Sequence, residues 1–338
     1  MNRVAVLGAG SWGTSLAIVL AENGLDTLIW SHRKDQANEI NFQHTNAKYL
    51  PSTILPDSLN ATSDMAEVVE HAGIIVMAVP TKGIRETCQK MLQTLNKKVL
   101  FVHVSKGIEP DSLMRISEIM REEIPAKFIE DIVVLSGPSH AEDVVQHHPT
   151  TVASACENIA SAERIQDLFM NQYFRVYTNE DVVGVEIGGA LKNVIALAAG
   201  AVDGLGFGDN AKAALITRGL AEISRLGVKL GANPLTFAGL AGMGDLIVTC
   251  TSVHSRNWRA GNMLGKGLSL DEILDQMGMV VEGVRTTQAA HQLAAKYDVS
   301  MPISEALYGV LFEGKDPHKV VKELMLREKT QELDATYE

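Results

Sequence analysis

The residues with the clearest chemical signature stand near the start of the chain. Residues 8–13 read Gly-Ala-Gly-Ser-Trp-Gly, a G-x-G-x-x-G pattern that directly follows an apolar run at residues 4–7. In a strand–turn–helix unit, Gly8 permits the tight turn, Gly10 lets backbone approach a pyrophosphate, and Gly13 lets the helix pack on the strand. The start of that helix also offers N–H groups to phosphates. The pattern predicts a dinucleotide site; a glycine-rich turn with packing duties alone is the alternative.

The end of the next apolar run, residues 27–30, indicates which dinucleotide binds. A site for NAD places Asp or Glu there, to accept a hydrogen bond from the ribose 2′-OH. This chain instead continues with Ser31, His32, Arg33 and Lys34. Because an Arg can hold a 2′-phosphate, the sequence favours NADPH, with NADH possible. A solvated basic loop is the alternative.

Lys192 is the strongest candidate for proton transfer. It lies within residues 184–202, which are apolar on nearly every side and therefore predict a buried helix. A buried Lys is costly unless it is paired or catalytic, and burial lowers its pKa towards neutrality. Its neighbours at helical spacing are small, which predicts a groove for a ligand: Gly188, Gly189, Ala196 and Gly200. The alternative is a Lys whose stem is buried while its head reaches water.

Two further charged residues follow apolar or glycine-rich segments. Asp245 stands in a Gly-Asp-Leu sequence, where its carboxylate could orient Lys192 or a substrate hydroxyl, or could simply cap a turn or helix. Lys106 closely follows the apolar run at residues 99–102. Because ligands bind beyond the carboxyl ends of parallel strands, Lys106 is well placed, although a solvated loop Lys is the alternative.

Ser255, Arg256 and Asn257 open a predicted helix, with Ser255 as its N-cap. An Arg and an Asn beside the N–H groups of a first helical turn form a plausible phosphate pocket. An ordinary capped helix with an exposed Arg is the alternative. The histidines His147 and His148 lack a ligand spacing, so we predict no metal site.

These residues need two kinds of scaffold. Six short, continuously apolar runs predict buried parallel strands at residues 4–7, 27–30, 74–77, 99–102, 132–135 and 151–153. They alternate with helical patterns, the first at about residues 12–23, which is typical of a doubly wound α/β sheet. Helical patterns dominate after about Asp181. We therefore predict a dinucleotide-binding domain at residues 1–180 and a helical substrate and catalytic domain at residues 181–338.

Composition limits the function classes. The 338 residues are 46% apolar and 21% charged, as expected of a folded chain with two domains. The net charge of −11 disfavours a nucleic acid partner but allows a small phosphorylated ligand. Cys88, Cys156 and Cys250 are widely spaced and suggest a reducing compartment. We see no leader pattern and no uninterrupted apolar stretch that could span a bilayer, so we expect a cytoplasmic protein with no integral membrane segment.

Taken together, the motifs resemble the bacterial NAD(P)H-dependent glycerol-3-phosphate dehydrogenases along essentially the whole chain. The matching segments, in family order, are residues 8–14, 104–107, 136–139, 189–193, 244–246 and 255–257. Residues 186–189 vary from the commoner family form only in a side-chain detail. The resemblance implies a Rossmann-type doubly wound sheet followed by an all-helical domain like that of 6-phosphogluconate dehydrogenase.

The resemblance also implies roles for single residues. Lys192 would give and take the proton at the substrate oxygen, while Asn193 and Thr249 support the site. The implied substrate residues are Lys106, Gly137, Ser139, Lys192, Asp245, Ser255, Arg256 and Asn257. The implied cofactor residues, with the three glycines Gly8, Gly10 and Gly13, are Ser11, Trp12, His32, Arg33, Tyr49, Lys106, Ala141, Arg256, Val280 and Glu282.

The implied reaction is the reversible NAD(P)H-dependent reduction of dihydroxyacetone phosphate to sn-glycerol 3-phosphate, which supplies glycerophospholipid synthesis, in a homodimer. A β-hydroxyacid or 6-phosphogluconate-type dehydrogenase is a second possibility, which predicts a carboxylate-binding site. A redox-sensing regulator that binds a dinucleotide without turnover is a third. Oxidation of a UDP-sugar is disfavoured, because it needs a Cys nucleophile in a matching loop.

Overall fold

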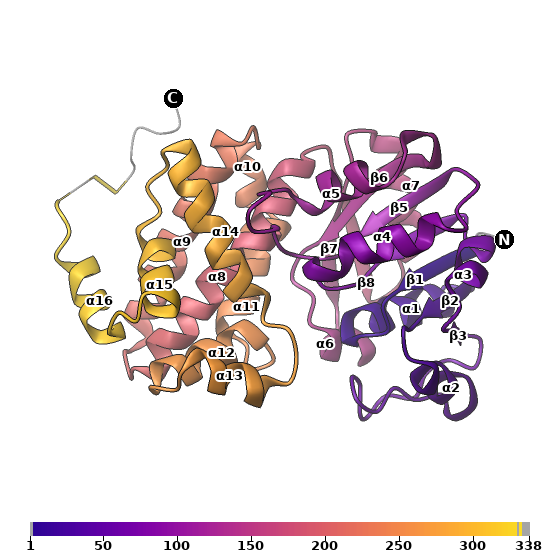
Figure 1. Ribbon diagram of the computed structural model, residues 1–338, viewed down its shortest axis with the longest axis horizontal. Helices are drawn as coiled ribbons and strands as arrows, with labels where there is room; N and C mark the ends of the chain where they lie inside the picture. The colour runs from indigo at the N-terminus through magenta and orange to yellow at the C-terminus, as the bar shows by residue number, and fades with distance from the viewer. Residues whose placement is uncertain (1–2, 330, 333–338) are drawn as a thin grey trace. The chain divides into compact units, whose positions relative to one another are not determined.

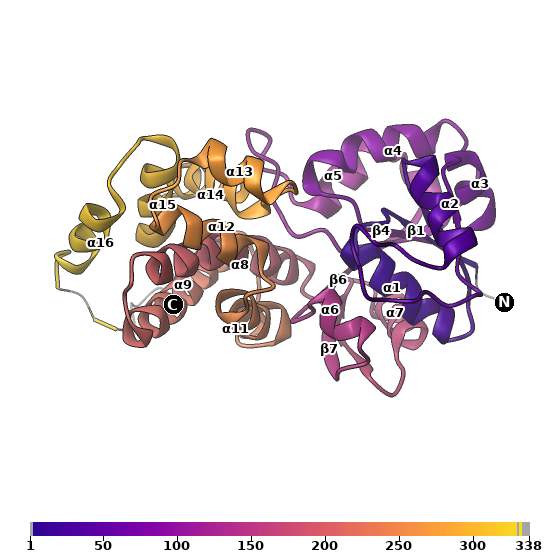
Figure 2. The same cartoon turned by 90° about the horizontal axis from the view of Figure 1, so that it is seen from below.

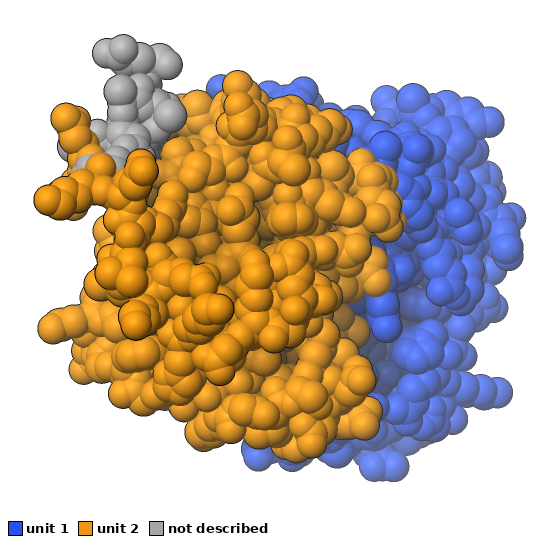
Figure 3. All heavy atoms as spheres, turned by 60° about the vertical axis from the view of Figure 1, so that its left-hand side comes forward, with its two compact units in different colours: residues 1–106, 114–186 blue, residues 107–113, 187–338 orange. Residues whose placement is uncertain are grey.

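The computed structural model describes residues 3–329 and 331–332. The chain divides into two compact units, which Figure 3 shows in blue and orange. Unit 1 comprises residues 1–106 and 114–186, and unit 2 comprises residues 107–113 and 187–338. The sequence alone suggested a boundary near residue 180 and gave no sign that residues 107–113 belong with the second half of the chain.

Unit 1 is built on one eight-stranded sheet (Figure 1). Its strands are β1 (Arg3–Leu7), β2 (Asp26–Trp30), β3 (Asn60–Thr62), β4 (Ile74–Met77), β5 (Val99–His103), β6 (Ile129–Ser136), β7 (Thr150–Ala155) and β8 (Phe174–Asn179). They lie in the order β3-β2-β1-β4-β5-β6-β7-β8. Successive strands run outward in both directions from β1, which is the predicted doubly wound arrangement.

The six predicted strands are all present, and the sequence missed two more. β3 has only three residues, and β8 alternates buried and exposed positions at its start, so neither forms the continuous apolar run of an interior strand. The prediction of an all-parallel sheet is wrong at one place. β6 and β7 pair antiparallel, with Val134 opposite Ala155, whereas all the other neighbours are parallel.

Helices cover both faces of this sheet (Figure 2). Val4 and Val6 of β1 point to one face, and Ala5 and Leu7 point to the other. The first face packs against α1 (Ser11–Glu22), α2 (Lys34–Gln43), α6 (Ala141–Val145) and α7 (Ile159–Phe169). The second face packs against α3 (Met65–His71), α4 (Ile84–Leu92) and α5 (Ile116–Glu123). The short helices η1 (Thr81–Gly83) and η2 (Ala126–Phe128) lie in the connections.

Unit 2 is helical, as predicted, and its described residues contain no strand. Its elements are α8 (Val182–Gly204), which starts in unit 1, α9 (Asp209–Lys229), α10 (Pro234–Phe237), the π-helical segment η3 (Leu240–Gly244), α11 (Asp245–Thr251), α12 (Arg256–Gly265), α13 (Leu270–Met277), α14 (Glu282–Tyr297), α15 (Pro302–Phe312) and α16 (Pro317–Met325).

Two helical segments are long and apolar enough to cross a membrane by length and composition alone, a test that the core helix of a folded protein also passes. They are α8, with mean hydropathy 1.6, and residues 234–251, with mean hydropathy 1.2. In α8, 94% of the apolar window is buried within the protein, against 39% in the second segment. Its burial identifies α8 as such a core helix.

Two of the four small residues predicted to form a ligand groove, Gly188 and Gly200, instead face backbone of neighbouring helices. A Cβ on Gly200 would lie 2.0 Å from the carbonyl oxygen of Trp258 in α12. A Cβ on Gly188 would lie 2.6 Å from the carbonyl oxygen of Ala241 in η3. Backbone of neighbouring helices therefore fills the space beside these glycines. The prediction is wrong at these two positions because small residues permit close helix packing just as well as ligand approach.

We expect Gly200→Ala to destabilise the protein by about 1–3 kcal/mol, because the added methyl group overlaps α12 backbone that cannot move aside. Thermal unfolding followed by circular dichroism measures this. Gly83→Ala is the matched control, since the nearest atom to its Cβ is 3.9 Å away. Equal melting temperatures for the two variants would contradict the packing described for Gly200.

Candidate active site

The glycine-rich turn of unit 1 is crowded at two of its glycines and open at the third. Gly8 has a φ of +119°, and a Cβ there would lie 2.6 Å from the carbonyl oxygen of Ala78. A Cβ on Gly13 would lie 1.9 Å from the carbonyl oxygen of Gly8. A Cβ on Gly10 would have no neighbour within 4 Å, and no side chain caps α1 there. The turn thus leaves room for a pyrophosphate at the start of α1, so these residues fit a dinucleotide.

Two buried amides that the sequence analysis missed hold this turn in place. Gln36 Nε2 donates to the carbonyl oxygen of Ala9 at 2.7 Å and to Asn46 Oδ1 at 3.0 Å. Asn46 Nδ2 donates to the same carbonyl at 3.1 Å and to Thr14 Oγ1 at 2.9 Å. Ser31 Oγ donates to Gln36 Oε1 at 2.6 Å, which ties the end of β2 to the network. No local motif marks these residues, because their partners are distant in sequence.

The remaining cofactor candidates of unit 1 lie around this turn. Ser11 Oγ donates to the carbonyl oxygen of Tyr49 at 3.0 Å, which brings two of them together. His32 is exposed at the end of β2. Arg33 follows it and pairs with Asp35, with Nε 3.1 Å from Oδ1. The other candidates are Trp12 at the start of α1 and Ala141 at the start of α6; the two helices pack together, and Ser15 Oγ of α1 donates to the carbonyl oxygen of Ala141 at 3.4 Å.

Three predicted substrate residues meet beyond the carboxyl ends of β5 and β6. Lys106 Nζ donates to the carbonyl oxygen of Gly137 at 3.0 Å, and Ser139 Oγ donates to the same oxygen at 2.8 Å. Gly137 has a φ of +146°, and a Cβ there would lie 2.9 Å from Cα of Val152. Only glycine fits this position, so the carbonyl that holds both side chains is set by the backbone.

Lys192 lies buried in α8, with 7% of its surface exposed. Its Nζ forms an ion pair and hydrogen bond with Asp245 and donates to Thr249 Oγ1 at 2.7 Å. Asp245 and Thr249 stand four residues apart in α11, so both side chains face α8. The buried carboxylate stabilises the ammonium form of Lys192. This arrangement can present a proton to a developing alkoxide.

Asn257 joins three helices of unit 2. Ser255 Oγ accepts a hydrogen bond from the Trp258 backbone N–H at 3.2 Å and so caps α12, as predicted. Asn257 Nδ2 donates to Asn193 Oδ1 in α8 at 2.8 Å. Its Oδ1 accepts from the Gly283 N–H at the start of α14, at 2.9 Å.

Arg256 is exposed in the first turn of α12, and its Nη1 donates to the carbonyl oxygen of Val280 at 3.3 Å. Glu282 opens α14 two residues later. The predicted residues Arg256, Val280 and Glu282 therefore belong to one neighbourhood of unit 2, formed where α14 begins beside α12.

A buried carboxylate in α8 was also missed. Glu186 accepts hydrogen bonds from the Ser117 N–H at 2.8 Å, from Ser117 Oγ at 2.7 Å and from Arg115 Nη1 at 2.5 Å. The ring of His103, which ends β5, lies 3.0 Å away. Burial by itself would raise the pKa of Glu186, but His103, Arg115 and Ser117 lower it to about 2.

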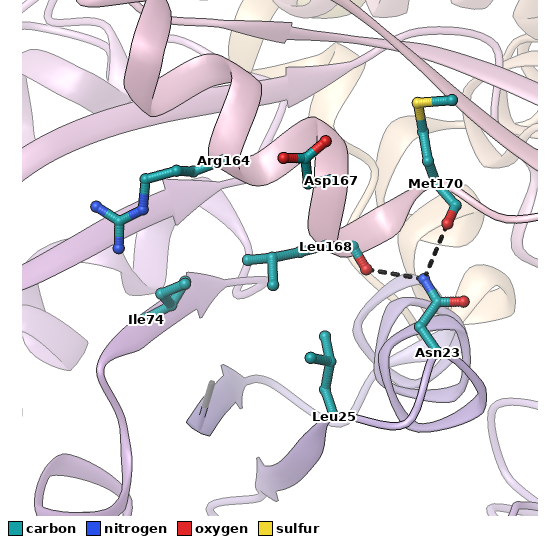
Figure 4. A pocket seen from close by; sticks show the side chains of 7 residues that line it. All are labelled: Asn23, Leu25, Ile74, Arg164, Asp167, Leu168 and Met170. Carbon is teal, nitrogen blue, oxygen red and sulfur yellow. Dashed lines mark hydrogen bonds between the residues drawn. The ribbon is translucent and has the colours of Figure 1, made fainter. Parts of the chain in front are cut away.

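A separate pocket of about 430 Å³ lies at the opposite ends of the strands (Figure 4). Leu25 precedes β2 and Ile74 begins β4, so the pocket opens at the amino ends of these strands. Asn23 Nδ2 bridges the carbonyl oxygens of Leu168 and Met170 at 2.8 and 3.4 Å (Figure 4). The glycine-rich turn is at the other end of β1, so this pocket is not part of the candidate site.

Comparison with known proteins identifies the family. The family model for the N-terminus of NAD-dependent glycerol-3-phosphate dehydrogenase matches residues 3–162, and the model for its C-terminus matches residues 181–322. The chain belongs to the NAD-dependent glycerol-3-phosphate dehydrogenase family. Family membership disfavours the two alternatives of a β-hydroxyacid dehydrogenase and a dinucleotide-binding regulator.

Individual relatives agree with the family match. A protein of Lysinibacillus sphaericus named glycerol-3-phosphate dehydrogenase (NAD(P)+) is 71% identical over 334 residues, which cover 99% of each chain. The crystal structure of glycerol-3-phosphate dehydrogenase from Coxiella burnetii has a TM-score of 0.92 at 37% identity, covering 96% of this chain and 99% of that one. A ketopantoate reductase from Ralstonia eutropha shares the fold alone, with a TM-score of 0.59 at 13% identity over 95% of this chain and 99% of that one. The predicted fold class is confirmed.

The environment of Glu186 predicts how stability depends on pH. Its pKa is about 2 in the folded protein against 4.5 for an ordinary Glu, so the unfolded chain binds the proton first as the pH falls. The stability that Glu186 contributes is complete above pH 4.5 and is lost as the pH falls towards 2. Between those pH values, the free energy of unfolding of the wild type should fall by on the order of 2–3 kcal/mol more than that of Glu186→Gln.

Urea unfolding at a series of acidic pH values measures this difference. Glu118→Gln is the control, because Glu118 also binds Arg115 but its side chain is 44% exposed. The free energy of unfolding of this variant should depend on pH as that of the wild type does. If Glu186→Gln and the wild type lost stability in parallel, the assigned charge network would be wrong.

Proposed function

We propose that this protein catalyses the reversible reduction of dihydroxyacetone phosphate to sn-glycerol 3-phosphate with NADPH or NADH. The observation that carries the proposal is the buried Lys192, held by Asp245 and Thr249, in a chain whose family matches cover both of its halves. The relative of 71% identity carries this enzyme name over its whole length.

Residues of unit 1 bind the pyrophosphate and the adenosine ribose of the cofactor. The open backbone at Gly10 and the start of α1 receive the pyrophosphate, and His32 and Arg33 at the end of β2 lie where the adenosine ribose would follow. When bound, the nicotinamide supplies the hydride to C2 of the ketone or takes it back from the alcohol.

Lys192 handles the proton. In reduction, its ammonium polarises the C2 carbonyl and gives one proton to that oxygen, so that ketone, hydride and proton yield the alcohol. Asp245 keeps the ammonium charged before the reaction, and Thr249 Oγ1 fixes the direction of a second N–H. In oxidation, the neutral amine accepts the proton from the hydroxyl.

The other predicted polar residues recognise the phosphorylated substrate. The guanidinium of the exposed Arg256 has parallel N–H groups whose geometry matches two phosphate oxygens. The Asn257 amide has a second N–H besides the one given to Asn193, and we assign it to the phosphate. Lys106, held with Ser139 on the Gly137 carbonyl, supplies positive charge for the substrate oxygens. These contacts would hold C2 in position for the transfer.

We further propose that the protein works as a cytoplasmic homodimer, has no nucleic acid partner, and supplies the glycerol phosphate backbone of phospholipids. The net charge of −11 supports the absence of a nucleic acid partner. The three cysteines Cys88, Cys156 and Cys250 are all free and buried, which agrees with a reducing compartment.

Loss of NADPH absorbance on addition of dihydroxyacetone phosphate tests the proposed reaction. We expect turnover with this substrate and none with 3-hydroxy acids in the reverse direction, because the assigned cations suit a phosphate. Absence of turnover with a protein that still binds NADPH would overturn the proposal and favour the regulator.

Lys192→Ala should lower kcat by at least about 100- to 10,000-fold, since this is the usual contribution of a positioned acid. NADPH binding, measured by fluorescence, should change little. Lys229→Ala is the control, because Lys229 is an exposed Lys at the end of α9 and should leave kcat unchanged. Near-normal turnover of Lys192→Ala would remove Lys192 from its assigned role.

A further inference from the structure

The end of β2 carries a carboxylate as well as a guanidinium. Arg33 Nε donates to Asp35 Oδ1 at 3.1 Å, and Arg33 Nη2 donates to the second carboxylate oxygen. The two side chains thus meet fork to fork, in the geometry that gives this pairing its specificity. Residues 31–34 carry no carboxylate, but Asp35 follows them directly.

A 2′-phosphate bound through Nε and Nη2 would need the same donors, and one bound through Nη1 and Nη2 would share a guanidinium whose charge Asp35 already offsets. The guanidinium recognises a phosphate through two parallel N–H groups, and Asp35 already uses Nε and Nη2. We propose that Asp35 sets the cofactor preference of this protein by competing with the 2′-phosphate of NADPH for Arg33. The inference rests on the proposed dinucleotide site and adds a residue that determines its specificity.

The position of Asp35 keeps its carboxylate available for this competition. Asp35 lies in the first turn of α2, where the helix dipole favours a negative charge, and Arg33 is the N-cap of the same helix. The two partners are therefore two residues apart on a fixed backbone. The Arg33 guanidinium also lowers the pKa of the Asp35 carboxyl, so the competitor stays ionised.

The pair is also open enough to be exchanged. The side chains of Arg33 and Asp35 are 40% and 67% exposed, so a phosphate arriving from solvent can reach the guanidinium. An exposed ion pair is worth little, unlike the buried pair of Arg115 and Glu186, whose side chains are 18% and 3% exposed. Asp35 therefore weakens phosphate binding at Arg33 without blocking it, whereas NADH has no 2′-phosphate and escapes the competition.

Calorimetric titration of the full-length protein with adenosine 2′,5′-bisphosphate and with ADP tests the proposal. In Asp35→Asn, the bisphosphate should bind about two- to fivefold more tightly, the range that an exposed ion pair is worth. ADP should show no such gain. Asp57→Asn is the matched control, because Asp57 is 96% exposed and lies near His44 instead, and it should leave both affinities unchanged.

A second background separates competition from simple charge repulsion. In Arg33→Ala, adding Asp35→Asn should give a much smaller gain for the bisphosphate, because no guanidinium is released. An equal gain in both backgrounds, or no gain in Asp35→Asn, would overturn the proposal. The titration contains no substrate, so its result is independent of whether the protein reduces dihydroxyacetone phosphate.

Discussion

The buried ammonium of Lys192 imposes the strictest requirement on unit 2, because a charge removed from water must meet an opposite charge. Asp245 meets it, from a helix 53 residues further along the chain. The segment that leads into α11 can approach α8 closely because α8 has a glycine, without a side chain, at the contact. A Cβ on Gly188 of α8 would lie 2.6 Å from the carbonyl oxygen of Ala241, in the segment that leads into α11. Gly188 therefore serves close packing, and close packing supplies the partner charge.

Unit 1 meets a different requirement, since its phosphate-binding turn must be rigid and yet leave space. The turn is rigid because its backbone is closely packed: Gly13 lies against the carbonyl oxygen of Gly8, and Gly8 lies against that of Ala78. Rigidity also comes from Gln36 and Asn46, whose amides converge on one carbonyl oxygen. Space comes from Gly10, where no atom would touch a Cβ. Because the backbone is already fixed, the turn loses little conformational entropy when a ligand binds, so the site is preorganised.

The degree of burial decides whether a charge pair in this protein stabilises the fold or can be exchanged for a ligand. The buried Glu186 accepts hydrogen bonds from Ser117 and Arg115 and lies beside His103, so it holds the end of β5 and the start of α8 together. Removing one partner of such a pair leaves an uncompensated charge, so the pair is structural. An exposed pair such as the one at the end of β2 is exchanged for a ligand at small cost, so it can tune selectivity.

The sequence by itself determined the features that depend on neighbouring residues: the six apolar strands, the glycine-rich turn, the buried helix around Lys192 and the cap at Ser255. Local periodicity and backbone freedom are properties of short segments, so they can be read without the fold. Only the tertiary structure decided the partners: Asp245 for Lys192, Asn46 for the turn, and backbone instead of ligand beside Gly200. The same limit explains the antiparallel β7, whereas β3 and β8 were missed because neither forms a continuous apolar run. Side-chain partners and strand directions depend on groups far apart in the chain, which no local pattern encodes.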